Sequence, residues 1–217
     1  MNDTAVFKSG ITLAVIAAIC TAMVTLTFRL TEERIIANEQ AWLERSLQPA
    51  LSGLFFDSGV TESKIVVSPP HELPGSEAAL IYRVYAKGAP VAALFVVSAR
   101  DGYAGPIRIL IGVDVTGVVT GVQVLEHRET PGLGDRIEST KSDWVKQFDG
   151  HSLVDPEPAG WGIRRDGGQF DQLTGASVTP RAIIKAIKET LLYFDAHSDQ
   201  VFADAATEID SEEKENP

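Results

Sequence analysis

The sequence predicts an α+β protein in which a single N-terminal transmembrane helix precedes one globular domain with an antiparallel sheet and packed helices. Three observations lead to this expectation. Between Lys8 and Arg29 lie 20 residues without a charge. Residues 80–125 are rich in β-branched and aromatic runs, which are typical of strands. A helix-spaced apolar pattern follows near the C-terminus, and such a helix can cover one face of the sheet.

The uncharged N-terminal run is long enough to cross a membrane as a helix. At about 1.5 Å per residue it spans ~30 Å, the thickness of the hydrocarbon core. A cleaved signal peptide stays open as the alternative, although its apolar core is shorter and it ends at an Ala-x-Ala-like site that is missing here. Basic residues flank the run on both sides, so their count does not fix its orientation. The single cysteine, Cys20, lies inside the run, which leaves no intramolecular disulfide.

We divide the chain into four parts. Residues 1–30 form the anchor, and residues 31–75 form a helical stalk and a loop-rich connection with a short strand at Ile65 to Val67. Residues 76–196 form the folded domain, and residues 197–217 form an acidic tail that we expect to be disordered. The net charge of −11 argues against a nucleic-acid partner, whose phosphates would demand a basic surface.

Within the folded domain two hairpins are expected. Leu80 to Ala86 and Val91 to Ala99 are joined by the turn Lys87–Pro90. A second pair, Ile107 to Val113 and Val118 to Leu125, is joined by residues 114–117.

Two further elements follow the hairpins. Ser139 to Phe148 is expected to be a short helix with Trp144, Val145 and Phe148 facing inwards, and Trp161 to Arg165 a further strand.

The last helix has the clearest start signal in the chain. Thr179 is expected as its N-cap and Pro180 as its first residue, where the fixed φ and missing N–H of proline cost nothing. The helix should run to about Phe194, with the apolar residues on one stripe: Ile183, Ile184, Ile187, Leu191 and Phe194.

A turn rich in hydroxyl groups precedes this helix. It reads Asp171-Gln-Leu-Thr-Gly-Ala-Ser-Val-Thr-Pro180. Unpaired backbone N–H groups and the helix dipole favour an anion at a helix N-terminus, so the turn is a candidate phosphate site. The alternative is a strand-to-helix connection with no ligand.

A second candidate segment, Glu126 to Asp135, follows the last expected strand. Its Thr-Pro-Gly-Leu-Gly sequence predicts a rigid, tight loop with exposed N–H groups, suited to close approach by a planar ligand. A plain connector remains the alternative. His127, Glu126 and Glu129 are too few for a metal site, so we expect an ion cluster with Arg128 and no metal.

Together these segments carry a resemblance to a known family. The apolar anchor, Asp101-Gly-Tyr-Ala-Gly105, the segment 126–135, Ser142-Asp-Trp144 and the turn 171–180 occur in the order seen in the G subunits of the Rnf (Rsx) electron transport complex. The turn is similar to the flavinylation motif of membrane-anchored FMN-binding proteins. The resemblance covers nearly the whole chain, from the anchor to about Phe194.

The resemblance implies a covalent FMN, held as a phosphoester by the hydroxyl after Gly-Ala. That position is Ser177, where the family usually has threonine; Thr174 and Thr179 are the rival hydroxyls. The implied cofactor-binding residues fall in two groups. The attachment turn comprises Asp171, Thr174, Gly175, Ala176, Ser177 and Thr179, and the surroundings of the isoalloxazine and ribityl groups comprise Glu129, Thr130, Pro131, Gly132 and Leu133, with Leu133 as apolar cover.

The implied function is electron transfer in a membrane complex that couples ferredoxin and NAD⁺ to ion translocation. The partners are the other subunits and a flavin transferase, Mg²⁺-dependent with FAD as donor, and the chain needs no substrate site of its own. The family further implies a bacterial inner-membrane location with a cytoplasmic N-terminus and a periplasmic domain. Two alternatives stay open: the FMN subunit of a related sodium-pumping quinone reductase, and a cofactor-free anchored scaffold.

Overall fold

The computed structural model describes residues 63–203, together with single residues of a helical stretch between Gly10 and Thr25. The chain divides into two units, Met1–Leu43 and Glu44–Pro217, which we treat separately. Within these described parts, no helix is both long and apolar enough to span a membrane. The rest of the expected anchor, the expected stalk up to residue 62 and the expected tail from residue 204 lie outside the described residues.

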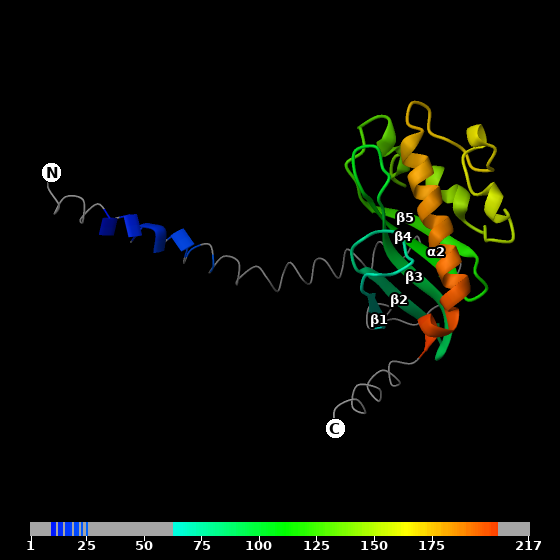
Figure 1. The fold of residues 1–217 in the computed structure, drawn as a ribbon, viewed down its shortest axis with the longest axis horizontal. Coiled ribbons are helices and arrows are strands. Elements are labelled where there is room, and N and C mark those ends of the chain that lie inside the picture. Colours follow the sequence, from blue (N-terminus) through cyan, green and yellow to red (C-terminus); the bar gives the residue numbers. More distant parts are fainter. Residues whose placement is uncertain are drawn as a thin grey trace, which may run out of the picture. The chain divides into compact units, whose positions relative to one another are not determined.

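The domain is built on a five-stranded antiparallel sheet in which each strand pairs with its neighbours in the chain (Figure 1). The strands are β1 (Lys64–Val67), β2 (Ala79–Ala86), β3 (Ala89–Ala99), β4 (Ile107–Asp114) and β5 (Val119–Glu126). The four strands expected from the two hairpin patterns are confirmed to within two residues at each end. The short strand expected near Ile65 is also present, at the edge of the same sheet.

The two hairpin turns follow from the residues that form them. Lys87 and Gly88 both have positive φ, 53° and 78°, as a two-residue turn matched to the strand twist requires. In the second turn, Asp114 Oδ1 accepts hydrogen bonds from the backbone N–H groups of Thr116 (2.8 Å) and Val118 (3.0 Å). These bonds fix the register of β4 and β5.

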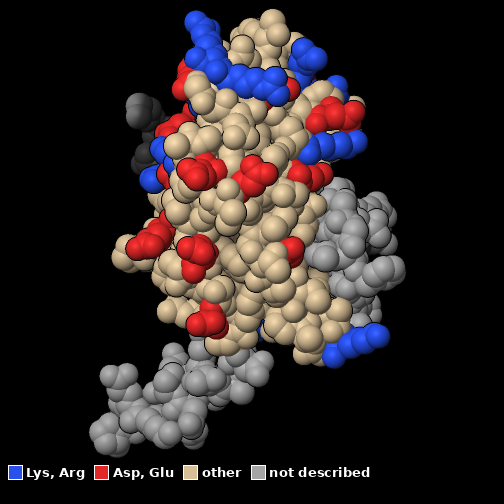
Figure 2. Space-filling model, turned by 90° about the vertical axis from the view of Figure 1, so that its right-hand side faces the viewer, with Lys and Arg blue, Asp and Glu red and all other residues tan. Residues whose placement is uncertain are grey.

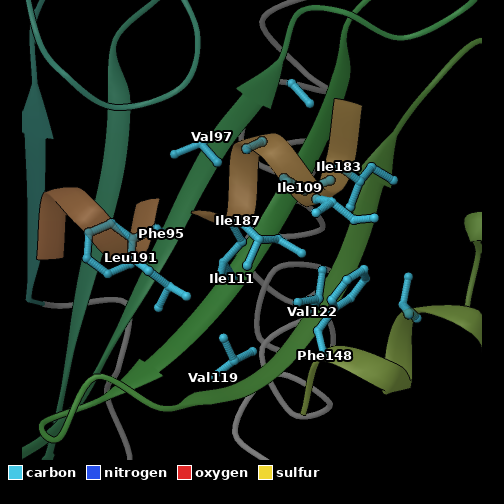
Figure 3. Close-up of a cluster of buried hydrophobic side chains, with 14 of the residues drawn as sticks. Phe95, Val97, Ile109, Ile111, Val119, Val122, Phe148, Ile183, Ile187 and Leu191 are labelled. Atoms are coloured by element: carbon cyan, nitrogen blue, oxygen red, sulfur yellow. The ribbon is translucent and has the colours of Figure 1, made fainter. Parts of the chain in front are cut away.

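One long helix, α2 (Val178–Phe202), lies across one face of the sheet (Figure 1). Alternate residues of the strands, such as Phe95 and Ile109, point towards it and meet Ile183, Ile187 and Leu191 of its apolar stripe (Figure 3). These five side chains are at most 1% exposed. Burying each one stabilises the fold by roughly 1.5–3 kcal/mol relative to exposure. The expected packing of the C-terminal helix on the sheet is confirmed.

The ends of α2 differ from expectation. The helix begins at Val178, with Ser177 at the N-cap, and not at Pro180. It also runs past Phe194 to Phe202, across non-helical backbone at His197 (φ −129°, ψ 16°). The Arg83 guanidinium of β2 donates a hydrogen bond to the carbonyl of Ala203, directly after the last turn. The first residues of the expected tail therefore belong to the folded domain.

The connection between β5 and α2 holds short 3₁₀ helices: η2 (Gly134–Ile137), η3 (Trp144–Phe148), η4 (Pro158–Gly160) and η5 (Arg164–Asp166). Only the second half of the helix expected at 139–148 is helical, although its three inward residues are buried as predicted. The prediction of a strand at Trp161 to Arg165 is wrong, and η5 begins within this segment. Gly162 and Gly168 pack backbone against backbone, so closely that a Cβ on Gly168 would stand 2.0 Å from the Gly162 carbonyl oxygen. The segment folds back on itself and leaves one parallel bridge, Ile163 with Phe170.

Candidate functional site

The turn before α2 is a tight four-residue reversal. The backbone N–H of Ala176 donates to the carbonyl of Leu173 at 3.1 Å, and Gly175 between them has a φ of +85°. A Cβ on Gly175 would lie 3.0 Å from Cδ2 of Leu133. The two segments that the sequence singled out therefore touch, although more than 40 residues separate them along the chain.

At the start of α2 the hydroxyl of Ser177 is uncommitted. Ser177 is half-buried at the N-cap, with φ −90° and ψ −23°, and its side chain makes no capping hydrogen bond. No acidic residue lies in the first turn. The first N–H groups of a helix lack partners within it, and they carry a partial positive charge. This end of α2 can thus receive an anion beside a free hydroxyl.

Thr179 does not cap the helix, contrary to the expectation from its position before Pro180. Its side chain is fully buried, and its hydroxyl donates to Oε2 of Glu129. The tertiary partner competes successfully for the hydroxyl because the Glu129 carboxylate is itself only 4% exposed and needs donors from within the protein. No sequence pattern predicts this pair, whose two residues lie 50 positions apart.

Glu129 joins three segments. Its Oε2 atom accepts from Thr179, and its Oε1 atom accepts from the backbone N–H of Ala104 at 3.0 Å. The close approach depends on Gly134, since a Cβ there would stand 2.9 Å from both Cβ and Oε2 of Glu129. The loop Asp101–Gly105 is also fastened to α2 by an ion pair of 2.6 Å between Asp101 and Lys185.

The loop at Thr130–Leu133 turns as tightly as its composition predicts. The carbonyl of Thr130 accepts from the N–H groups of Leu133 (3.2 Å) and Gly134 (3.1 Å), and Gly132 has a φ of +79°. Thr130, Pro131 and Gly132 are exposed, and Leu133 is 44% exposed beside Gly175. The loop places an apolar side chain beside Gly175, but two of the N–H groups expected to be exposed, those of Leu133 and Gly134, are bonded within the loop.

An ion cluster supports the base of this loop. His127 accepts the backbone N–H of Glu129 at Nδ1 (3.1 Å), and its Nε2 lies 3.0 Å from Glu138. Lys141 bridges Glu138 (2.5 Å) and Asp135 (3.0 Å). Hydrogen bonding to the Lys141 ammonium holds the pKa of both carboxyl groups below the usual range. An ion cluster does lie at His127, but its other members are Glu138, Lys141 and Asp135, so the members expected from the sequence are wrong.

Arg128 is not part of that cluster. Together with Arg100 and Arg108 it lines a separate hollow of about 530 Å³, which none of the motif hydroxyls reaches. Across residues 63–203 and the described positions near the N-terminus, no group of three or more His, Cys, Asp or Glu side chains is placed to hold a metal ion.

The backbone of Asp171 is anchored by the segment around Trp144. The Trp144 indole donates to the Asp171 carbonyl (2.7 Å), and the Asp171 N–H donates to Gln147 (2.7 Å). The Asp171 carboxylate faces outwards, where it pairs with Arg164 at 3.1 Å. Asp171 and Thr174 line a shallow hollow of about 360 Å³ with Arg136 and Trp144.

The structure thus brings both predicted groups of residues to the end of the sheet where α2 begins. Figure 2 shows Lys and Arg side chains gathered at this end of the domain, whereas acidic side chains are spread below it. Sequence reasoning gave no role to Tyr103, which is 72% exposed in the loop held by Glu129. The sequence feature that could have drawn attention to it is an aromatic residue in a short segment with glycines at 102 and 105.

Two family models match this chain. The family model of the FMN-binding domain matches residues 102–192, and that of the RnfG N-terminal region matches residues 1–49. Among solved structures, the crystal structure of Shewanella oneidensis NqrC has a TM-score of 0.44 and 20% identity over 68% of this chain and 76% of its own.

Curated relatives extend over nearly the whole sequence. The G subunit of the ion-translocating oxidoreductase complex of Shewanella piezotolerans is 39% identical over 94% of this chain and 97% of its own length. The corresponding G subunits of Vibrio parahaemolyticus and Pseudomonas aeruginosa are 38% and 39% identical, and cover 92% and 90% of this chain and 94% and 92% of their own. The chain therefore belongs to the G-subunit family of the ion-translocating oxidoreductase complexes.

Proposed function

We propose that this chain is an electron-carrying subunit of an ion-translocating oxidoreductase complex and that Ser177 holds its FMN through a phosphoester. The observation that carries the proposal is the uncommitted Ser177 hydroxyl at the start of α2, beside the Thr130–Leu133 loop. The match to the FMN-binding domain family supports the choice of cofactor.

The residues present fit such a group. The open N–H groups of the first turn of α2 would bind the phosphate oxygens, and the basic side chains at this end of the domain favour its charge. Leu133 would give apolar cover, and the exposed backbone of Thr130–Gly132 would let a planar ring approach closely. When bound, FMN supplies the electron-accepting and electron-donating chemistry, and the chain supplies attachment, orientation and electrostatic environment.

Attachment requires a separate flavin transferase, with FAD as donor and Mg²⁺ as its metal ion. Ser177 Oγ forms a bond to the FMN-side phosphorus of FAD, the P–O–P bridge breaks, and AMP leaves. The hydroxyl proton passes to a base of the transferase. Asp171, Thr174, Gly175 and Ala176 form the turn that the enzyme recognises. A covalent carrier cannot diffuse away in a compartment without a flavin pool.

The complex would couple electron flow between ferredoxin and NAD⁺ to ion movement, with the other subunits as partners. The uncharged run between Lys8 and Arg29 supports an anchor in the bacterial inner membrane. We place the domain on the periplasmic side. The FMN subunit of a sodium-pumping quinone reductase is the second candidate, and the G-subunit family of the relatives argues against it.

The test is covalent labelling in cells that co-express the transferase. After denaturing electrophoresis, the native chain should fluoresce under ultraviolet light and gain the mass of one esterified FMN. Ser177→Ala should lose the band, and Thr179→Val should keep it. A fluorescent Ser177→Ala chain, or a colourless native chain of unmodified mass, would overturn the proposal.

A further inference from the structure

The attachment motif offers three hydroxyl groups within six residues, at Thr174, Ser177 and Thr179. A transferase that presents one activated phosphorus can modify a hydroxyl group only if that group is accessible and free to attack. The structure gives each hydroxyl a different environment. Selection among them presupposes the proposed function, since it concerns which hydroxyl receives the flavin.

Thr179 is withheld from reaction. Its side chain has no exposed surface, and its hydroxyl proton is donated to the Glu129 carboxylate. For Thr179 Oγ1 to reach phosphorus, the bond to Glu129 would have to break and the first turn of α2 would have to leave Gly134. Both Glu129 oxygens are occupied, by Thr179 and by the Ala104 N–H, so the carboxylate is held in place.

Thr174 is accessible but lies in a different place. It is exposed in the Leu173–Ala176 turn, on the other side of Gly175 from the helix. A phosphate esterified there would not adjoin the open N–H groups of α2, because those groups follow Ser177. Thr174 therefore lacks the electrostatic support that the helix start gives to an anion.

Ser177 is left free by an unusual N-cap. The oxygen of an N-cap serine ordinarily accepts a hydrogen bond from the N–H of the second or third helical residue. Here the third residue is Pro180, which has no N–H, and the backbone N–H of the second residue, Thr179, makes no capping bond to Ser177. The helical backbone of Ser177 also departs from the extended conformation of a capping residue. The structure accordingly shows no capping bond at Ser177.

We propose that Pro180 and Glu129 together select the flavin acceptor. Pro180 acts as a positioning residue, because it removes a donor that would otherwise engage Ser177 Oγ. Glu129 keeps the neighbouring hydroxyl of Thr179 occupied. The serine oxygen then attacks phosphorus with its lone pairs free, while AMP departs and the proton moves to a base of the transferase.

The rate of flavin attachment tests the role of Pro180. Pro180→Ala restores the N–H of the third helical residue and lets Ser177 form a cap, which must break before attack. We expect the turnover rate with purified transferase and saturating FAD to fall about fivefold, the factor that corresponds to a cap of ~1 kcal/mol. The KM for FAD should stay the same. Val178→Ala is the matched control, since it changes an exposed side chain of the same turn and adds no donor.

Thermal unfolding of the unmodified chain separates this effect from damage. Pro180 is buried, and the new cap should offset the packing lost with its ring, so the melting temperature of Pro180→Ala should stay near that of the native chain; loss of packing without a cap would lower it. Equal rates for Pro180→Ala and Val178→Ala would overturn the role of Pro180. A slower rate accompanied by a lower melting temperature, in both Pro180→Ala and Pro180→Ser, would overturn it as well.

Mass mapping of the modified peptide tests the role of Glu129. In Ser177→Ala, Thr179 should remain unmodified while the Glu129 pair is intact. Flavin found on Thr179 of that folded variant would overturn selection by Glu129. These outcomes are distinct from failure of the proposed function, which would show as no flavin on the native chain at all.

Discussion

Replacing Thr179 by valine should destabilise the domain more than any other isosteric Thr→Val change in α2. Valine keeps the shape of threonine but removes the hydroxyl that donates to Glu129. The carboxylate is 4% exposed, so water cannot readily replace the lost donor. A hydrogen bond to a charged group contributes about 1.5–3 kcal/mol, and a buried oxygen left without its donor costs a similar amount. We expect the free energy of unfolding to fall by about 2–3 kcal/mol.

Thr190→Val provides a matched control in the same helix. Thr190 is also fully buried, but its hydroxyl donates at 2.8 Å to the carbonyl of Ala186, one turn earlier. That carbonyl lies at the position to which the backbone N–H of residue 190 bonds in an α-helix, so it keeps a partner after the change. Threonine and valine have similar helix propensities. The loss in Thr190→Val should therefore stay below about 1 kcal/mol.

The assay is urea unfolding of the unmodified domain, followed by far-ultraviolet circular dichroism, with thermal unfolding as a second measure. For a domain of this size, ~2 kcal/mol corresponds to a melting temperature lower by roughly 4–8 °C. The slope of the unfolding free energy against urea concentration should be the same in the native domain and both variants, since the surface exposed on unfolding does not change. If Thr179→Val and Thr190→Val differ by less than about 0.5 kcal/mol, the Glu129–Thr179 bond does not brace the site as we argue.

Two further predictions concern the same loop. Gly134→Ala should destabilise the domain by about 1–3 kcal/mol in urea unfolding, because the new Cβ would stand 2.9 Å from Glu129. Gly162→Ala is the control, since its Cβ would lie 3.7 Å from its nearest neighbour and should change the free energy of unfolding little. Equal losses of stability in the two variants would contradict the steric argument. The pKa values of Asp135 and Glu138 are lowered chiefly by hydrogen bonds to Lys141, so their stabilising effect is present above the ordinary carboxyl pKa and is lost as pH falls through the lower folded-state pKa. Stability measured from about pH 5 down to pH 2 should accordingly decline less steeply in Lys141→Met than in the native domain, and parallel curves would rule out Lys141 as the cause.

Local patterns were enough to predict the sheet and the main helix. The strands are bounded by residues with strong turn preferences, such as Gly88 and Gly117, and their apolar runs have no competing helical period. The stretch 149–171 was harder because its structure depends on tertiary packing. There Phe148, Trp161 and Phe170 form a small aromatic core, with ring centroids 4.8–6.5 Å apart, and the backbone between them is irregular.

The candidate site shows the same division. Composition alone predicted tight turns at Gly132 and Gly175, and both glycines have positive φ. The bond between Glu129 and Thr179 was not predictable, since neither the spacing nor the residue types mark two side chains 50 positions apart as neighbours. The N-cap was misplaced by two residues because the capping preference of Thr179 is a local tendency, and a buried carboxylate overrides it.

The length of α2 bears on how an electron could reach a prosthetic group at its start. The helix has 25 residues and would measure about 37 Å if straight. It packs along the sheet, with its first turn bonded to Glu129 and the residue after its last turn bonded to Arg83. Tilting the start of the helix would require breaking the bond to Glu129 and the packing of its apolar stripe on the sheet. Under the proposed function, the cofactor would therefore sit on a rigid support, and movement towards a partner would involve the ester linkage or the domain as a whole.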